Sequence, residues 1–395
     1  MEVVAPAWQA ALAGPIIVYG LGLLWFLRGA RLAEDVSEPS AREFPSVTIV
    51  VAARNEVEHV QGCLQGLAMQ TYPKDCFEIV LVDDGSTDGT GELAHTTASQ
   101  VSETGTRIQI VDGPSIYGQG GSKKAALTLG IEKSAGEIVL TTDADCQVPP
   151  RWVESMVARF SSQTGAVVGF SQIAATHGPG AQLARWEGLD FLQLMTAAAG
   201  SCAQGHPMAA SGQSLGFRRQ AFHDVGGYGQ VKHRVSGDDV LLLQLIRGTG
   251  RWVIDFCGDT GARVIHPPSP GLRSFLSRRA RWASNAPLQM RMDPFFFCYM
   301  LATFLASASL LSSVALWALG GVSLSLVGAL WAGKVTAEAA LACTGARRFA
   351  RMDLLWAFPS WTVLQPLYTV LVGLVGPAGF FRWKGRRVAL GRQSA

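Results

Sequence analysis

Three long apolar stretches constrain this chain more than any other feature. They cover residues 6–27, 294–344 and 354–381, and the region between the first two has the mixed composition of a globular protein. A helix needs about 20 apolar residues to cross the hydrocarbon core of a bilayer. We therefore expect an integral membrane protein that carries a globular domain over residues 46–270.

The first apolar stretch, Ala5 to Leu27, predicts a retained anchor over residues 1–30, followed by a linker over 31–45. A cleaved signal peptide is the alternative, but the stretch has no basic residue before it. Arg28 and Arg31 follow it instead, and lysine and arginine mark the cytoplasmic side of a membrane segment. These residues predict a plasma or inner membrane protein whose globular domain lies in the cytosol.

The C-terminal part of the chain predicts a membrane region over residues 293–395. Pro294 to Ala332 is too long for one helical span and fits two, with a turn near Gly320. Leu354 to Phe381 is long enough to cross, but prolines interrupt it and arginines lie on both sides. This third segment is either a span or a re-entrant, broken helix, which leaves two or three C-terminal spans open.

A basic, amphipathic helix is expected just before these spans. It covers Leu272 to Ala286, is stopped by Pro287, and belongs to an interface segment over residues 271–292. Its arginines alternate with Phe275 and Trp282, a composition typical of a helix lying at a membrane surface.

Short apolar strands alternate with helical patterns in the globular part, which indicates an α/β fold with a mostly parallel sheet. In such sheets ligands bind at the carboxyl ends of the strands. The expected strands are residues 47–52, 77–82, 108–111, 138–142 and 166–173, with a further short strand and helix over 211–219 and helices over 180–200 and 240–246.

The fourth expected strand runs directly into Asp143 and Asp145. Residues at i and i+2 of an extended chain point the same way, so the two carboxylates can share one target. Hard oxygen ligands suit Mg²⁺ or Mn²⁺ bound together with substrate phosphates. A solvated, Asp-rich turn after a strand is the alternative.

Further charged residues fall at the ends of other expected strands and helices. A D-D-G-S turn can be a local cap, and a pair of lysines can be a solvated helix face. Several carboxylates at one sheet edge, however, repel one another unless cations lie among them. The residues are Asp83, Asp84, Asp238 and Asp239, with Lys123 and Lys124 after the glycine-rich run 118–122.

Two other classes of protein are disfavoured by composition. A net charge of +3 is too small to indicate nucleic-acid binding. The seven cysteines are scattered without C-x-x-C spacing, which fits reduced cytosolic thiols better than disulfides or a zinc site.

Taken in order, these motifs resemble the inverting family 2 glycosyltransferases of GT-A fold, specifically the membrane-anchored ones. The resemblance covers residues 45–285 and the flanking membrane segments. The matching motifs are V-V-A-A-R-N-E (50–56), V-D-D-G-S-T-D-G-T (82–90), S-K-K-A-A-L-T-L-G (122–130), T-D-A-D-C (142–146), G-D-D (237–239) and R-R-A-R-W (278–282).

The resemblance implies a role for each matching residue. The donor would be a nucleotide-sugar, a UDP-sugar in particular, and the acceptor a lipid or a lipid-linked or growing glycan. Asp239 would be the general base, and Asp145, with Asp143, would bind the metal. Ala53, Arg54, Glu56, Asp83, Asp84, Lys123 and Asp143 would bind the nucleotide-sugar, and Asp238, Arg278, Arg281 and Trp282 would contact the acceptor and the diphosphate.

The chain departs from the family pattern at two positions. Asp238 replaces the family's glutamate, and Arg278 replaces the glutamine of Q-x-x-R-W, as in sequences similar to ceramide glucosyltransferases. The second change argues against a processive polymer synthase. A glycan synthesis-and-translocation channel component and a non-catalytic nucleotide-sugar-binding protein remain as alternatives, and the donor sugar and the acceptor stay open.

Overall fold

The computed structural model describes residues 4–33, 44–113, 123–234, 236–379, 382–383 and 386–387. Contacts divide the chain into two compact units. The first comprises Met1–Leu32, Ala175–Ser201 and Pro268–Ala395, and the second comprises Ala33–Ala174 and Cys202–Pro267. Residues 175–201 lie inside the range expected for the globular domain, yet they pack with the first unit.

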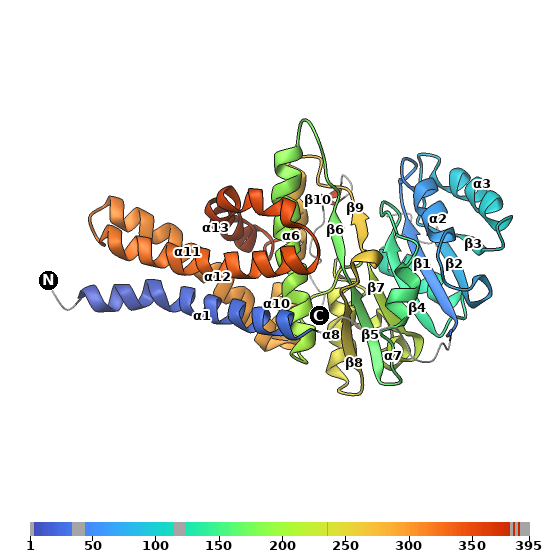
Figure 1. Ribbon diagram of the computed structural model, residues 1–395, viewed down its shortest axis with the longest axis horizontal. Helices are drawn as coiled ribbons and strands as arrows, with labels where there is room; N and C mark the ends of the chain where they lie inside the picture. The colour runs from blue at the N-terminus through green and yellow to red at the C-terminus, as the bar shows by residue number, and fades with distance from the viewer. Residues whose placement is uncertain are drawn as a thin grey trace. The chain divides into compact units, whose positions relative to one another are not determined.

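The second unit is built on a seven-stranded sheet with the strand order β3-β2-β1-β4-β7-β5-β8 (Figure 1). The first four strands in that order are parallel, and β7 is antiparallel to both of its neighbours. The α/β class and the mostly parallel sheet are confirmed. The strands are β1 (Val47–Ala53), β2 (Phe77–Asp83), β3 (Arg107–Asp112), β4 (Ile138–Asp143), β5 (Thr164–Gly169), β7 (Leu215–Arg218) and β8 (Val253–Cys257).

Helices cover both faces of this sheet, which is why its central strands are apolar almost throughout. Ile49 and Val51 of β1 belong to a core that also contains Leu64 of α2, Ala94 of α3 and Trp152 of α5. On the other face, Val80 and Val82 pack with Ala126 of α4. The helices of this unit are α2 (Val60–Ala68), α3 (Thr90–Ser102), α4 (Lys123–Glu132), α5 (Trp152–Val157), α7 (Arg219–Asp224) and α8 (Val240–Gly248), with short 3-10 turns at Lys74–Cys76, Gly229–Val231 and Thr260–Ala262.

The single strand expected over residues 166–173 is wrong, because the chain changes partner at Phe170. Gly169 still pairs with β8, whereas Ser171 begins β6 (Ser171–Ile173), which pairs with β9 (Val264–His266) in a separate two-stranded sheet. The backbone of Phe170 bonds to Cys257 on one side and to Val264 on the other.

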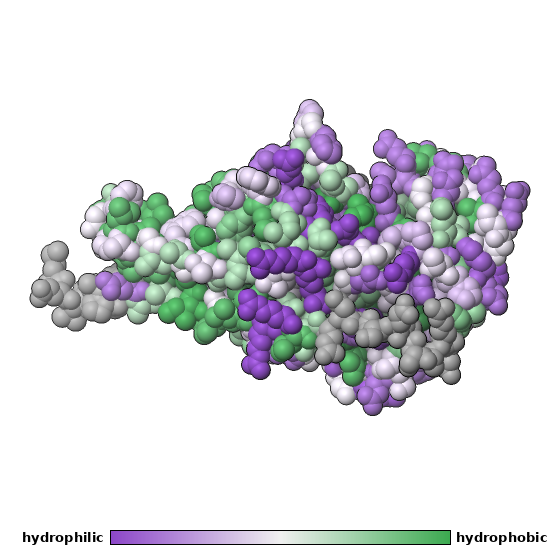
Figure 2. Space-filling model, viewed as in Figure 1, coloured by the Kyte–Doolittle hydropathy of each residue, from purple (hydrophilic) through white to green (hydrophobic). Residues whose placement is uncertain are grey.

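The first unit is helical. Within it, α1 lies beside α11 and α12 (Figure 1). In the part of the chain that the structure describes, four of its helical segments are long and apolar enough to cross a membrane. Apolar side chains such as Leu21, Leu305 and Leu371 are exposed on them, and Figure 2 shows hydrophobic residues over much of the surface of these helices. Its elements are α1 (Val4–Leu32), α6 (Ala181–Ala203, whose last residues lie beyond the unit), α9 (Leu272–Ala283), α10 (Ala286–Met292), α11 (Pro294–Ala318), α12 (Leu324–Arg348), a 3-10 turn (Met352–Ala357), α13 (Phe358–Val375), β10 (Arg382–Trp383) and β11 (Arg386–Arg387).

The expected basic helix over residues 272–286 is two helices in the structure. The first, α9, ends at Ala283, and Pro287 lies in the first turn of α10 rather than after a helix end. A first turn tolerates proline, because the N–H that proline lacks has no partner within the helix there.

The apolar segment that begins at residue 354 contains a proline inside its helix. Pro366 of α13 has no N–H for the carbonyl of Thr362 four residues earlier. Lys334 of α12 donates to that carbonyl at 2.9 Å and pairs with Glu338 at 2.7 Å. Tyr19 of α1 donates to the same glutamate at 2.9 Å, so this buried network joins three membrane-type helices.

Candidate active site

The sheet register places the ends of three neighbouring strands at one edge, and two of these strands end in an acid. Ala53 at the end of β1 is level with Asp83 at the end of β2, and Ala52 is level with Asp143 at the end of β4. Because the three strands are parallel, these residues all lie at their carboxyl ends, where open α/β sheets bind ligands.

Asp143 and Asp145 come together in a tight turn after β4. The N–H of Cys146 donates to the carbonyl of Asp143 at 3.1 Å, which closes the turn. The two carboxylates and the Cys146 thiol have ligand atoms within 4.8 Å of one another. Burial, and then the charge of Asp143, raise the pKa of Cys146 well above its ordinary value, so the thiol stays protonated. The residues therefore fit a hard cation such as Mg²⁺ or Mn²⁺ at the two carboxylates.

Lys123, the first residue of α4, lies between two carboxylates from different parts of the unit. Its Nζ is 2.7 Å from Oδ1 of Asp143 and 2.7 Å from Oδ2 of Asp238. Burial lowers the pKa of Lys123, but the two carboxylates raise it more, and it ends well above its ordinary value. The lysine is thus a fixed cation that joins the D-x-D turn to the G-D-D turn.

Asp239 caps the N-terminus of α8. Its carboxylate accepts from the N–H of Val240 at 2.6 Å and from the N–H of Gly212 at 3.0 Å. Burial and then the charge of Asp238 raise the pKa of Asp239 above its ordinary value, despite these two N–H donors. Burial alone would raise the pKa of Asp238 as well, but Lys123 and then Lys124 lower it to about 2. The neighbouring acids therefore differ: one stays ionised, and the other is the better proton acceptor near neutral pH.

The two acids at the end of β2, Asp83 and Asp84, hold the local backbone. Asp84 is buried and lies 3.6 Å from Arg54, whose guanidinium also donates to the Asp84 carbonyl at 3.1 Å. Asp83 accepts from the N–H and the hydroxyl of Ser86, which is the local turn that the sequence left open as an alternative. The N–H of Glu56 bonds to the hydroxyl of Thr90 at 2.8 Å.

Three of the expected acceptor residues belong to the first unit. Arg278 of α9 lies 3.3 Å from Glu187 of α6, and Arg281 and Trp282 are half-buried on the same helix. Sequence reasoning did not single out Arg279, which is buried, forms an ion pair with Asp190, and lies 4.4 Å over the ring of Trp282.

Two residues of the second unit were also missed. Gly212 binds Asp239 through its backbone, for which a sequence gives no signal. Lys124 was noted only as half of a lysine pair, yet it is 2% exposed. The glycine-rich run at residues 118–122 lies outside the described residues.

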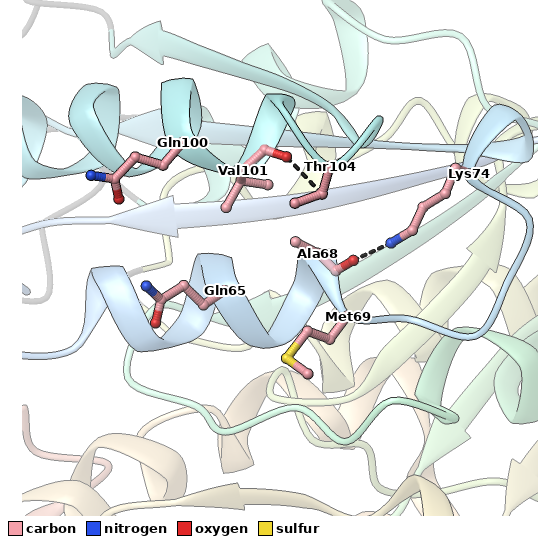
Figure 3. Close-up of a pocket in the computed structure, with 7 residues that line it drawn as sticks. All are labelled: Gln65, Ala68, Met69, Lys74, Gln100, Val101 and Thr104. Atoms are coloured by element: carbon pink, nitrogen blue, oxygen red, sulfur yellow. Dashed lines mark hydrogen bonds between the residues drawn. The ribbon is translucent and has the colours of Figure 1, made fainter.

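A separate pocket of about 400 Å³ lies between α2 and α3 (Figure 3). Its lining includes Ala68 at the end of α2 and Thr104 just after α3, and Lys74 donates to the carbonyl of Ala68. The ends of these helices lead into the starts of β2 and β3, so the pocket is at the opposite edge of the sheet from the acids. It is therefore not part of the candidate active site.

Comparisons with known proteins give matches to one family. The model of glycosyl transferase family 2 matches residues 48–226, and that of glycosyl transferase family group 2 matches residues 138–375, which is more than half of the chain. Glycosyltransferase AglE of Haloferax volcanii is 30% identical over 196 residues, which are 50% of this chain and 59% of that protein. Beta-monoglucosyldiacylglycerol synthase of Synechocystis is 29% identical over 305 residues, which are 70% of this chain and 58% of that protein.

The chain therefore spans less than two thirds of the length of either relative. Among solved structures, a mannosyltransferase from Pyrobaculum calidifontis, in complex with GDP-Man and Mn²⁺, is similar in fold. The TM-score is 0.60 at 22% identity, and the match covers 93% of this chain and 98% of that one.

Proposed function

This chain belongs to the family 2 glycosyltransferases, and from that premise we propose that it transfers a sugar from a UDP-sugar to a lipid or to a lipid-linked or growing glycan. The observation that carries the proposal is the position of Lys123, whose Nζ is 2.7 Å from both Asp143 and Asp238. Asp143 ends β4 and is followed by Asp145 in the next turn, and Asp238 is followed by Asp239, the N-cap of α8.

In the proposed reaction Asp239 is the general base. The acceptor hydroxyl oxygen forms a bond to the anomeric carbon of the sugar as the bond from that carbon to the diphosphate oxygen breaks. The hydroxyl proton passes to Asp239, and the nucleoside diphosphate leaves with the bonding electron pair. One displacement inverts the configuration, so an α-linked donor gives a β-linked product.

The other charged residues have supporting roles in this proposal. Lys123 orients Asp238 and provides positive charge beside the departing diphosphate. A Mg²⁺ or Mn²⁺ ion held by Asp145 and Asp143 would offset the negative charge that develops on that diphosphate. Ala53, Arg54, Glu56, Asp83 and Asp84 lie at the ends of β1 and β2, or just after them, where a nucleoside would contact them.

We place the reaction at the cytosolic face of the plasma or inner membrane. The arginines after α1 favour a cytosolic second unit, with residues 1–30 as the anchor and residues 271–292 at the membrane surface. A lipid acceptor is supported by the membrane-type helices of the described residues and by the name of the Synechocystis relative, which denotes a diacylglycerol product. We assign acceptor and diphosphate contacts to Arg278, Arg281 and Trp282.

The test is a nucleotide-release assay in membranes with a panel of UDP-sugars and, for comparison, GDP-mannose. We expect release of UDP from one donor, loss of release in excess EDTA, and loss in Asp145→Ala. Full activity in EDTA would contradict metal dependence. Release from GDP-mannose alone would contradict the proposed UDP donor but not the transfer reaction.

A further inference from the structure

Lys124 is a buried lysine one residue after the lysine that bridges the active-site acids. Its side chain is 2% exposed, whereas that of Lys123 is 23% exposed. Its ammonium donates to the backbone carbonyl of Arg234 at 2.7 Å and to that of Ser236 at 2.9 Å. These are contacts to the loop that leads into the G-D-D turn, not to a carboxylate.

The two bonds fix the backbone immediately before the acids. Ser236 is itself buried, and Gly237 follows with φ of 85°, a left-handed conformation that favours glycine. The chain then enters α8, with Asp239 at its cap. The hydrogen bond to Ser236 and the left-handed conformation of Gly237 together set the positions of the next two residues, Asp238 and Asp239.

The helix that carries Lys124 is itself fixed to the sheet. Ala126 and Leu127 of α4 are buried. Gly130 packs so closely on β1 that an added Cβ would lie 2.5 Å from Cγ1 of Val50. The first turn of α4 is therefore held rigidly against the sheet. Through Lys124, this turn fixes the loop before α8 relative to the sheet.

A lysine at this buried position is unfavourable in itself. Burial lowers the pKa of Lys124 to about 8, although the charges of Asp238 and Asp239 oppose that effect. A methionine would fill similar space without the cost of desolvating an ammonium. Compared with methionine, lysine adds two hydrogen bonds to the loop and a charge that helps to lower the pKa of Asp238.

We propose that Lys124 is a positioning residue for the general base: its ammonium holds the backbone of Arg234 and Ser236, so that Asp239 stays aligned with the acceptor hydroxyl. The proposal rests on the proposed role of Asp239. Lys123 and Lys124 together make the first turn of α4 a support that fixes the metal-binding turn and the general base relative to each other.

The test compares Lys124→Met with Lys133→Met, which changes an exposed lysine just beyond the other end of α4. For Lys124→Met we expect kcat to fall about 10- to 100-fold, the scale of a small misplacement of a catalytic group. The affinity for UDP with Mn²⁺ should change little, because nucleotide contacts come from other strands. Hydrogen–deuterium exchange should rise over residues 234–241 and not elsewhere. Lys133→Met should match the wild type in all three measurements.

An unchanged kcat, or unchanged exchange over residues 234–241, would overturn the proposal. Faster exchange throughout the second unit, together with a lower Tm, would also overturn the proposal, because that result would indicate a general packing role for Lys124. If Lys124→Met does not fold, Lys124→Arg is measured in the same way, since it keeps the charge but alters the donor geometry. The exchange measurement needs no substrate. A failure of the proposed function, seen as normal turnover of Asp239→Asn, is therefore distinguishable from a failure of this inference.

Discussion

The ammonium of Lys123 lies 2.7 Å from Asp238, and it is equally close to Asp143 of the D-x-D turn. A cation that binds Asp143 must therefore compete with this ammonium. For Lys123→Met we expect Mn²⁺ to bind the nucleotide-free protein about two- to fivefold more tightly, the scale of a partly exposed ion pair, while kcat falls. Titration of Mn²⁺ by electron paramagnetic resonance measures the affinity, with Lys133→Met as control. Weaker Mn²⁺ binding in Lys123→Met would show that the lysine does not occupy the position of a competing cation.

The pH dependence of turnover should follow Asp239. Its pKa is raised by burial and by the charge of Asp238, and only the ionised carboxylate can accept a proton. We therefore expect kcat to fall as the pH drops through that raised pKa, while Asp238 remains ionised until its own pKa of about 2. Asp238→Asn removes one of the two causes, so the acid limb of its residual activity should move to lower pH. A pH profile of kcat for both proteins checks this, and an acid limb that stays in place contradicts it.

Much of the sheet could be predicted because its central strands are buried on both faces. The strands β1, β2 and β4 read as apolar runs, whereas β3 is an edge strand in which Ile108 and Ile110 alternate with polar residues. Each of the four lies within one or two residues of its expected bounds. The change of partner at Phe170 and the strands β8 and β9 could not be predicted, since partner choice depends on contacts distant in the sequence. Pro287 was expected to end a helix, but proline also suits a first turn, and nearby residues do not distinguish the two.

The candidate site was only partly predictable for a similar reason. Carboxylates at strand ends are visible in a sequence, because strands and turns have local patterns. The bridge from Lys123 to Asp238 and the bond from the N–H of Gly212 to Asp239 are not visible, because they join residues that are 115 and 27 positions apart. Lys124 could equally have been a solvated residue on the surface of α4, and only the fold distinguishes the two cases.

Gly212 should tolerate no side chain. An added Cβ would lie 3.0 Å from Oδ2 of Asp238 and 3.1 Å from Nζ of Lys123, closer than most such contacts. We expect Gly212→Ala to displace these groups and to lower kcat about tenfold or more, without loss of the fold. Gly248→Ala is the matched control, because an added Cβ there meets nothing within 4 Å. Equal turnover of the two variants would contradict the close packing of this site.

The network at Lys334 should matter for stability rather than for chemistry. Lys334→Met leaves Glu338 buried without its cationic partner, a change that typically costs about 3–5 kcal/mol. It also leaves the Thr362 carbonyl, which Pro366 cannot satisfy, without a donor from Lys334. We expect a large fall in Tm in detergent for this variant and a smaller fall for the double variant with Glu338→Gln. If Tm falls equally in the single and the double variant, loss of the ion pair does not explain the lower stability of Lys334→Met.

The central claim is that Asp239 takes the proton from the acceptor, and the most direct measurement is turnover together with UDP affinity in Asp239→Asn and Asp238→Asn. Asparagine keeps the shape, but its one side-chain oxygen can accept only one of the two N–H bonds that Oδ1 and Oδ2 of Asp239 accept from Val240 and Gly212, and it cannot serve as a base. We predict that Asp239→Asn binds UDP with Mn²⁺ as the wild type does and loses about 10²- to 10⁴-fold in kcat, the scale of a lost general base, whereas Asp238→Asn loses less. Normal turnover of Asp239→Asn, with Asp238→Asn inactive, would assign the base to the other aspartate and contradict the account.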